Sequence, residues 1–163
     1  NWKVYVDNYV EGYHIPSVHP SLSQELDYRS YRTETFKWYS VQHAPSKADA
    51  KIYNDTSQGE AFYYWLFPNL MLNIVQGVLQ TNVVIPMGLE STIIRFEWFT
   101  KPGFDKSRMK ELMGFSDLIQ AEDAEICSQV QKNLHSETYS RGRYSLKREN
   151  GLHHFHSLLA GLL

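Results

Sequence analysis

Alternating hydrophobic and polar positions divide the chain into a central block of strands with helices on either side. Five runs rich in β-branched and aromatic residues lie between residues 31 and 100: "YRTETFKWYSVQHA", "AFYYWLF", "LMLNIVQ", "VLQTNVVIP" and "STIIRFEWFT". Pro-Asn, Gln-Gly and Pro-Met-Gly breaks separate the later runs, a pattern typical of antiparallel strands that follow one another along the chain. Apolar and polar residues alternate imperfectly in these runs, which predicts a sheet with one face against a core or cavity and the other partly exposed to solvent.

Helical patterns occur on both sides of this block. Residues 2–15 predict a helix that Pro16 ends, because proline lacks an amide hydrogen and pushes its predecessor out of the α region. A second helix is expected over residues 107–134, and a last one from about Ser145 to the end of the chain. Strands in a block flanked by helices predict an α+β fold, and 163 residues suit a single domain.

Composition narrows the possible ligands and surroundings. The chain has 16 Lys and Arg against 18 Asp and Glu, and its basic residues are scattered except in "RGRYSLKR", so nucleic-acid binding is not indicated and a small molecule is expected. No apolar run approaches the ~20 residues that a membrane span needs. Cys127 is the only cysteine, which excludes an internal disulfide and favours a reducing, cytoplasmic setting. The abrupt start, without a signal peptide, suggests a fragment of a longer protein.

One carboxylate lies on the apolar side of the helix expected over residues 107–134. At 100° per residue, the hydrophobic side chains form one stripe: Ile119, Ile126, Val130 and Leu134. Asp123 lies inside that stripe, whereas Glu122 and Glu125 point progressively away from it, as surface acids do. A buried carboxylate must be paired, protonated or bound to a metal. Two interpretations therefore stay open, a salt bridge to an arginine such as Arg95 or Arg108, and a metal site.

The segment "DNYVEGYHIPSVHP", residues 7–20, supplies two histidines that favour the metal site. On one continuous helix, residues five apart would be rotated by about 140°, but the break at Pro16 frees His19 to turn toward His14. Two imidazoles and one distant carboxylate form the facial triad that leaves open positions on non-haem Fe(II). A di-iron or zinc site is a rival, because "EGYH" has Glu-x-x-His spacing, but "SQVQKNLH" provides no second copy.

Three segments together resemble a known family. "NWKVYVDNYVEGYHIPSVHP", "QAEDAEICSQVQKNL" and "GRYSLKRENGLHHFHSLLA" are similar to the catalytic domain of Rieske non-haem iron oxygenases, the aromatic-ring-hydroxylating α subunits, and they span nearly the whole chain. The resemblance implies a helix-grip fold of the START/Bet v 1 kind, in which a curved antiparallel sheet wraps a long helix around a cavity. It also implies that His14, His19 and Asp123 bind iron, so that residues 1–163 form a mononuclear-iron catalytic domain.

The same resemblance suggests a role for Glu11, which we expect one helical turn before His14. Many ring-hydroxylating members have aspartate at this position, where it bridges the iron histidine to the Rieske histidine of a neighbouring subunit. Glutamate at this position resembles the version found in family members that act on quaternary amines, and the segment "FYYWLFPNLMLN" resembles those members too. A cationic substrate needs aromatic faces, and we expect Phe62, Tyr64 and Phe67 to line its pocket.

The implied activity is O2-dependent hydroxylation or N-demethylation of a small organic substrate, either an aromatic acid or a quaternary ammonium or betaine compound. Whether one or two oxygen atoms are inserted stays open. Electrons would come from NADH through a reductase or ferredoxin to a [2Fe–2S] Rieske cluster, whose two Cys and two His this chain does not supply. The cluster is therefore expected in a preceding domain, the fragment alone is expected to be inactive, and the full-length protein is expected to be a homotrimer. The alternative is a metal-free helix-grip module that binds a small molecule.

Overall fold

A computed structural model describes residues 1–54 and 59–162. One antiparallel sheet contains six strands in the order of the chain. The strands are β1 (Arg32–Thr35), β2 (Tyr39–Pro45), β3 (Glu60–Leu66), β4 (Leu70–Val75), β5 (Val78–Pro86) and β6 (Thr92–Thr100). The helices are α1 (Trp2–Tyr9), α2 (Ile15–Val18), α3 (Pro20–Glu25), α4 (Lys106–Leu134) and α5 (Asn150–Ala160). The α+β class predicted from the block of strands is confirmed.

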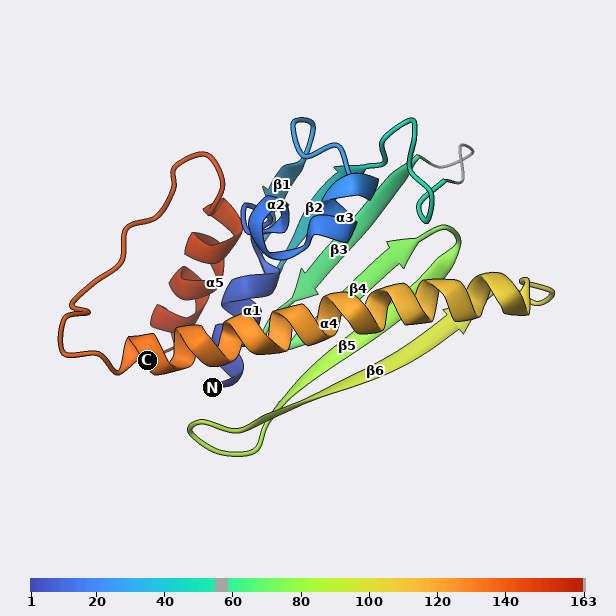
Figure 1. Cartoon of the computed structure of the whole chain (residues 1–163). Coiled ribbons are helices and arrows are strands. Elements are labelled where there is room, and N and C mark those ends of the chain that lie inside the picture. The colour runs from blue at the N-terminus through green and yellow to red at the C-terminus, as the bar shows by residue number, and fades with distance from the viewer. Residues whose placement is uncertain (55–58, 163) are drawn as a thin grey trace.

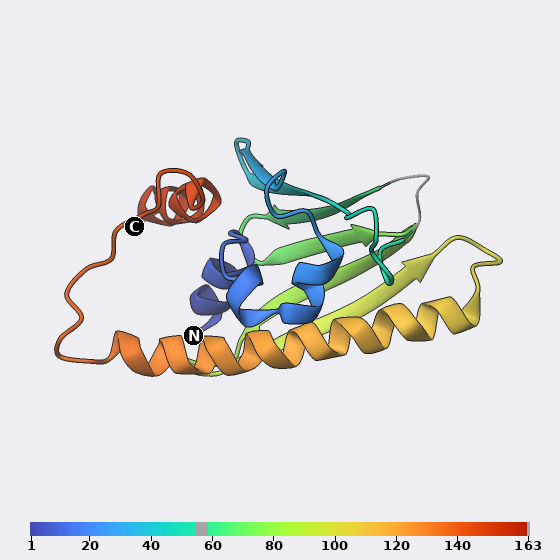
Figure 2. The same ribbon diagram turned by 45° about the horizontal axis from the view of Figure 1, so that its top comes forward.

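The curved sheet and the long helix α4 form two layers, with α1, α2 and α3 beside them (Figure 1). Figure 2 shows α4 running along one face of the sheet, with the short helices between α4 and the sheet at one end. Helix α1 contacts both α4 and β5, and α5 packs on β1. This arrangement confirms the predicted helix-grip architecture. None of the described helices is long and apolar enough to cross a membrane.

The core nearest the C-terminal helix is built around two aromatic rings. Trp65 and Phe155 are fully buried, and their ring centroids lie 5.2 Å apart in an edge contact. Helix α5 begins at Asn150, not near Ser145 as predicted, and the last residue of the chain lies outside the described part. Gly151 lets α5 approach the end of α1, because a Cβ atom there would overlap the carbonyl oxygen of the residue that caps α1.

The single helix predicted over residues 2–15 is wrong beyond Tyr9. The chain turns over residues 10–14 and then forms α2 and α3, so Pro16 lies in the first turn of a helix and does not end one. Proline suits that place because the first amides of a helix have no intrahelical partner. His14 and His19 lie on either side of the short helix α2, and His19 also directly precedes α3.

Helix α4 begins one residue before the predicted start, but its buried face is shorter than the predicted stripe. Leu112, Ile119 and Asp123 are buried, whereas Val130 and Leu134 are each 40% exposed. The last turns of α4 extend beyond the sheet (Figure 1), so an apolar residue there has little to pack against. The carboxylate that the pattern placed on the buried face does lie there.

Candidate metal centre

A row of five side chains crosses the inner face of the sheet. Each residue lies directly opposite the next in the register of β2 to β6: Gln42, Tyr63, Asn73, Gln80 and Trp98. Because alternate residues of a strand point to opposite faces, one such row fixes which residues of every strand face inward. All five line a cavity between the sheet and α4.

The cavity has a volume of about 100 Å³, and aromatic, aliphatic, neutral polar and ionisable side chains line it. The rings come from Tyr9, Tyr31, Tyr53, Tyr63 and Trp98. The aliphatic side chains are Ile15, Leu22, Val75, Val78, Leu112 and Ile119. The neutral polar ones are Asn8, Gln42, Asn73, Gln80, Ser116 and Gln120. The ionisable ones are Glu11, His14, His19 and Asp123.

The aromatic residues predicted for the pocket do not line this cavity. Phe62, Tyr64 and Phe67 are absent from its lining, and the prediction is wrong for all three. Strand β3 points Tyr63 inward, so its two neighbours face the other side, where Phe62 packs edge-on against His43 with 5.2 Å between ring centroids. A shift of one residue along the strand accounts for the error at Phe62 and Tyr64, whereas Phe67 lies beyond the end of β3 and packs edge-on against Trp65.

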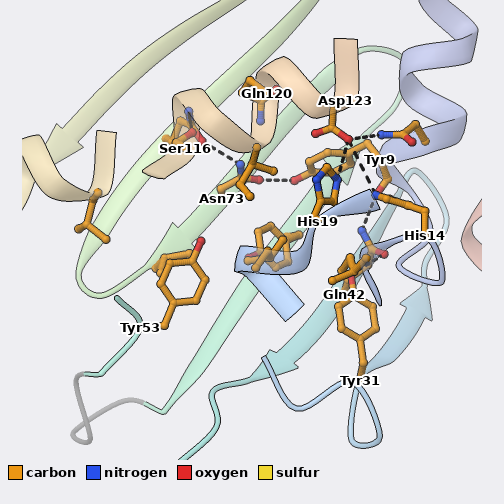
Figure 3. Close-up of a pocket in the computed structure, with 18 of the residues that line it drawn as sticks. Tyr9, His14, His19, Tyr31, Gln42, Tyr53, Asn73, Ser116, Gln120 and Asp123 are labelled. Carbon is orange, nitrogen blue, oxygen red and sulfur yellow. Dashed lines mark hydrogen bonds and ion pairs between the residues drawn. The ribbon is translucent and has the colours of Figure 1, made fainter. Parts of the chain in front are cut away.

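Two histidines and one aspartate converge at the end of the cavity beside α1. His19 Nε2 lies 3.0 Å from Asp123 Oδ1, and His14 Nε2 lies 3.9 Å from the same oxygen. One ligand atom from each side chain lies within 4.8 Å of the others. Figure 3 shows both imidazole rings turned toward Asp123 from below α4. The structure thus brings together the three residues that the sequence proposed as metal ligands.

A second carboxylate lies behind each histidine. His14 Nδ1 contacts Glu11 Oε1, and His19 Nδ1 lies 2.7 Å from Glu122 Oε2. When a carboxylate accepts the Nδ1–H of an imidazole, it fixes the tautomer and leaves the Nε2 lone pair free for a metal. Both rings therefore turn Nε2 toward Asp123 with Nδ1 anchored.

Glu11 reaches His14 from a turn and not from a helix, so the predicted helical geometry is wrong although the two side chains meet. The carboxylate of Glu11 also accepts the backbone N–H of Tyr13 at 2.6 Å, which stabilises the turn after α1. Only 6% of Glu11 is exposed. Glu122, predicted to be a surface acid, was missed as a partner of His19. Its position beside Asp123 in the chain is the one local signal that could have pointed to it.

Asp123 has no arginine partner among the described contacts, which leaves the salt-bridge interpretation unsupported. Its Oδ1 accepts a hydrogen bond from Asn8 Nδ2 at 2.6 Å. The two candidate arginines pair elsewhere, Arg108 with Glu111 and Arg95 with Glu97 on the exposed outer face of β6. The buried carboxylate of Asp123 is therefore hydrogen-bonded to Asn8 and His19, and His14 Nε2 lies 3.9 Å away.

Electrostatics at this site favour a positive charge between the carboxylates. Burial by itself would lower the pKa of His19, but its hydrogen bonds to Asp123 and Glu122 outweigh burial and raise that pKa above 6.5. A metal ion would take the place of the proton on Nε2 of His19 beside Asp123, while Nδ1–H would still donate to Glu122. A divalent ion would therefore replace that proton without leaving a buried negative charge unpaired.

The donor set fits iron. Imidazole nitrogen and carboxylate oxygen are ligands that Fe(II) accepts, and two histidines with one carboxylate leave further positions open. Ligand atoms bound at about 2.1 Å and at right angles lie about 3 Å apart, close to the separation of His19 and Asp123. His14 would need to move toward Asp123 by less than 1 Å to match it.

A chain of hydrogen bonds extends from α1 across the cavity wall to α4 (Figure 3). Tyr9 Oη donates to Asn73 Oδ1 at 2.6 Å, Asn73 Nδ2 donates to Gln80 Oε1 at 2.9 Å, and Gln80 Nε2 donates to Ser116 Oγ at 3.0 Å. Burial raises the pKa of Tyr9 well above 10, so its phenol remains a donor. The wall is therefore polar without being charged.

Comparison with known proteins places the chain in a family. The family model for the ring hydroxylating alpha subunit (catalytic domain) matches residues 1–163. The chain is 38% identical over 164 residues to a choline monooxygenase of Arabidopsis thaliana, covering 98% of the chain and 38% of that protein. It is 30% identical over 174 residues to the carnitine monooxygenase oxygenase subunit of Escherichia coli K12, covering 98% of the chain and 46% of that protein.

Solved structures show the same fold. The quaternary ammonium Rieske monooxygenase CntA in complex with L-carnitine matches with a TM-score of 0.76 and 24% identity, covering 99% of the chain and 45% of that protein. A second structure of a quaternary ammonium Rieske monooxygenase matches with a TM-score of 0.82, 23% identity and coverage of 99% and 47%. The chain spans less than half the length of these relatives. With its full length matched, the chain belongs to the family of ring-hydroxylating α-subunit catalytic domains.

Proposed function

We propose that this chain is the catalytic domain of an iron-dependent monooxygenase that hydroxylates a small quaternary ammonium compound. The observation that carries the proposal is the convergence of His14, His19 and Asp123 at one end of a cavity lined with aromatic and neutral polar groups. The names of two relatives, a choline monooxygenase and a carnitine monooxygenase, support the class of substrate. Hydroxylation of a carbon bonded to nitrogen would lead to N-demethylation or to C–N cleavage.

Fe(II) bound at this triad would supply the activation of O2. The chain's own residues hold the site in shape, because Glu11 and Glu122 anchor the two imidazoles through Nδ1 and Asn8 holds the carboxylate of Asp123. Aromatic and aliphatic side chains line the cavity beside the triad, where the reacting carbon would lie. In the overall reaction the C–H bond becomes C–OH, the second oxygen atom leaves as water, and two electrons and two protons complete the balance.

The source of the electrons is part of the proposal. We propose NADH as the donor, acting through a reductase or ferredoxin and a Rieske [2Fe–2S] cluster. The single cysteine of these 163 residues supplies fewer thiolates than such a cluster needs, so its ligands would come from elsewhere. Glu11, buried beside His14, is the proposed link to that cluster in a homotrimer. A cytoplasmic location stays a prediction.

Oxygen-isotope labelling tests the proposal. The full-length protein is loaded with Fe(II), supplied with NADH and its reductase, and incubated with choline under ¹⁸O2. The oxygen of an aldehyde exchanges with water, so the carbonyl product is reduced with borohydride as soon as it forms. Mass spectrometry is expected to find ¹⁸O in this reduced product. The variant Asp123→Ala is expected to form no product, whereas Glu125→Ala matches the wild type. Unlabelled product, or equal turnover by Asp123→Ala, would contradict the proposal. Tight binding of choline without metal or turnover would favour the metal-free binding module.

A further inference from the structure

We infer that the cavity selects an organic cation whose polar end is a neutral oxygen, such as a hydroxyl, and discriminates against zwitterions that carry a carboxylate. This inference rests on the proposed function and divides its class of substrate in two. Three features carry it: the sign of the charges that line the cavity, the aromatic faces, and the direction of the hydrogen bonds along its wall.

The charged side chains of the lining are acidic apart from the two histidines of the triad. The described residues that line the cavity include no lysine and no arginine, but they include the acids Glu11 and Asp123. Arg108 acts electrostatically on Tyr53, but its guanidinium pairs with Glu111 and donates to the Ile52 carbonyl. The two positive charges of Fe(II) at the triad would be matched by Asp123 and Glu11, so a substrate carboxylate would enter a buried space with no cation left to pair with it, which is costly.

Aromatic rings supply the part of the lining that a cation prefers. Tyr53 lies at the end of the cavity away from Asp123 (Figure 3), and its ring packs edge-on against Phe115 with 5.6 Å between centroids. Tyr63 and Trp98 come from the same inward row of the sheet. The face of an aromatic ring attracts a cation, and the attraction strengthens where water is excluded. A neutral molecule of the same shape gains none of it.

The hydrogen bonds of the wall leave donors facing the cavity. The amide oxygens of Asn73 and Gln80 are already used, since each accepts from its neighbour in the chain of hydrogen bonds that starts at Tyr9. Ser116 Oγ accepts from Gln80 Nε2 at the end of that chain, so its own O–H is available to donate. An uncharged substrate oxygen is a suitable acceptor, and it brings no second charge into the cavity.

Ligand charge tests the inference without turnover. The full-length, Fe(II)-loaded protein is titrated anaerobically in a calorimeter with choline, with its neutral isostere 3,3-dimethyl-1-butanol, and with L-carnitine. We expect choline to bind at least about tenfold more tightly than either, the order of magnitude of a desolvated cation–π contact. Equal affinity for L-carnitine or for the neutral isostere would overturn the inference. Preference for choline without hydroxylation would instead contradict the proposed function alone.

A serine variant tests the anchoring oxygen. Ser116→Ala is expected to weaken choline binding about fivefold, the typical value of one hydrogen bond, and to leave ethyltrimethylammonium, which lacks the hydroxyl, unchanged. Ser128→Ala is the matched control on the same helix, because Ser128 Oγ donates to the Ala124 carbonyl on an exposed face. Equal weakening of both ligands, or of neither, would refute the assignment of Ser116.

Discussion

Removing the carboxylate of Glu122 is expected to weaken metal binding although Glu122 is not itself a proposed ligand. Its Oε2 lies 2.7 Å from Nδ1 of His19, a side chain that is 1% exposed, so water cannot easily replace it. Loss of a carboxylate behind a metal-binding histidine typically reduces metal affinity by about 10- to 100-fold, or about 1.4–2.8 kcal/mol. Glu122 is 26% exposed, and in Glu122→Gln the glutamine amide oxygen can still accept a hydrogen bond from Nδ1 of His19. The Fe(II) affinity of Glu122→Gln is therefore expected to fall by about tenfold, the lower end of that range.

The assay is anaerobic titration of each variant with Fe(II) in competition with a chromophoric chelator. Glu122→Ala, which removes the acceptor altogether, is expected near the upper limit of about a hundredfold. Glu125→Gln is the control, because Glu125 lies three residues on, is exposed, and accepts only from Gln129 among its described contacts. Equal Fe(II) affinity for all three variants and the wild type would refute the assignment of Glu122 to the site.

Three further predictions concern parts of the chain away from the triad. Gly151→Ala is expected to lower the free energy of unfolding by about 1–3 kcal/mol in chemical denaturation, because the added methyl group would force α5 away from the end of α1. Gly161→Ala is the control, since a methyl group fits there and the free energy of unfolding should change little. Asp7 accepts a hydrogen bond from His156 Nε2 at 2.9 Å, and this bond raises the pKa of the histidine. The stabilisation from the pair is therefore fully present below about pH 6.5, and it is lost as the pH rises through the raised pKa. Asp7→Asn should therefore lower Tm more at about pH 6 than at about pH 9, and an equal loss at both would contradict it. Burial raises the pKa of Cys127 to about 12, so iodoacetamide at about pH 8 should label it slowly in the folded protein and rapidly after denaturation, and equal rates would contradict it.

The strands were predictable because turn residues mark their ends. The strands β3 to β6 lie within one residue of the ranges that the pattern predicts, and Gln76 and Gly77 both take positive φ angles in the turn between β4 and β5. The N-terminal helix was predicted too long for a tertiary reason. Gly12 packs directly against Tyr31, where a Cβ atom would overlap the ring. A partner 19 residues away in sequence leaves no periodic signal in residues 2–15.

The proposed ligands were readable in the sequence for local reasons. Asp123 interrupts an apolar stripe of one helix, and Pro16 lies between His14 and His19. Each signal lies within one short segment, so it can be recognised without knowing the fold. The inward face of β3 was not readable, because "AFYYWLF" is apolar at nearly every position and alternation does not distinguish its two faces. The contact of Glu122 with His19 spans 103 residues and became visible only in the fold.

We propose that His14, His19 and Asp123 together hold one iron ion, and the metal content of the purified protein shows whether they do. The protein is purified anaerobically with Fe(II), together with the variants His14→Ala and Asp123→Ala and the control Glu125→Ala, and the folding of each is checked by circular dichroism. We expect one iron per chain in the wild type and the control, and loss of iron in the two ligand variants while the fold persists. Stoichiometric zinc, no metal, or iron retained by folded Asp123→Ala would contradict it.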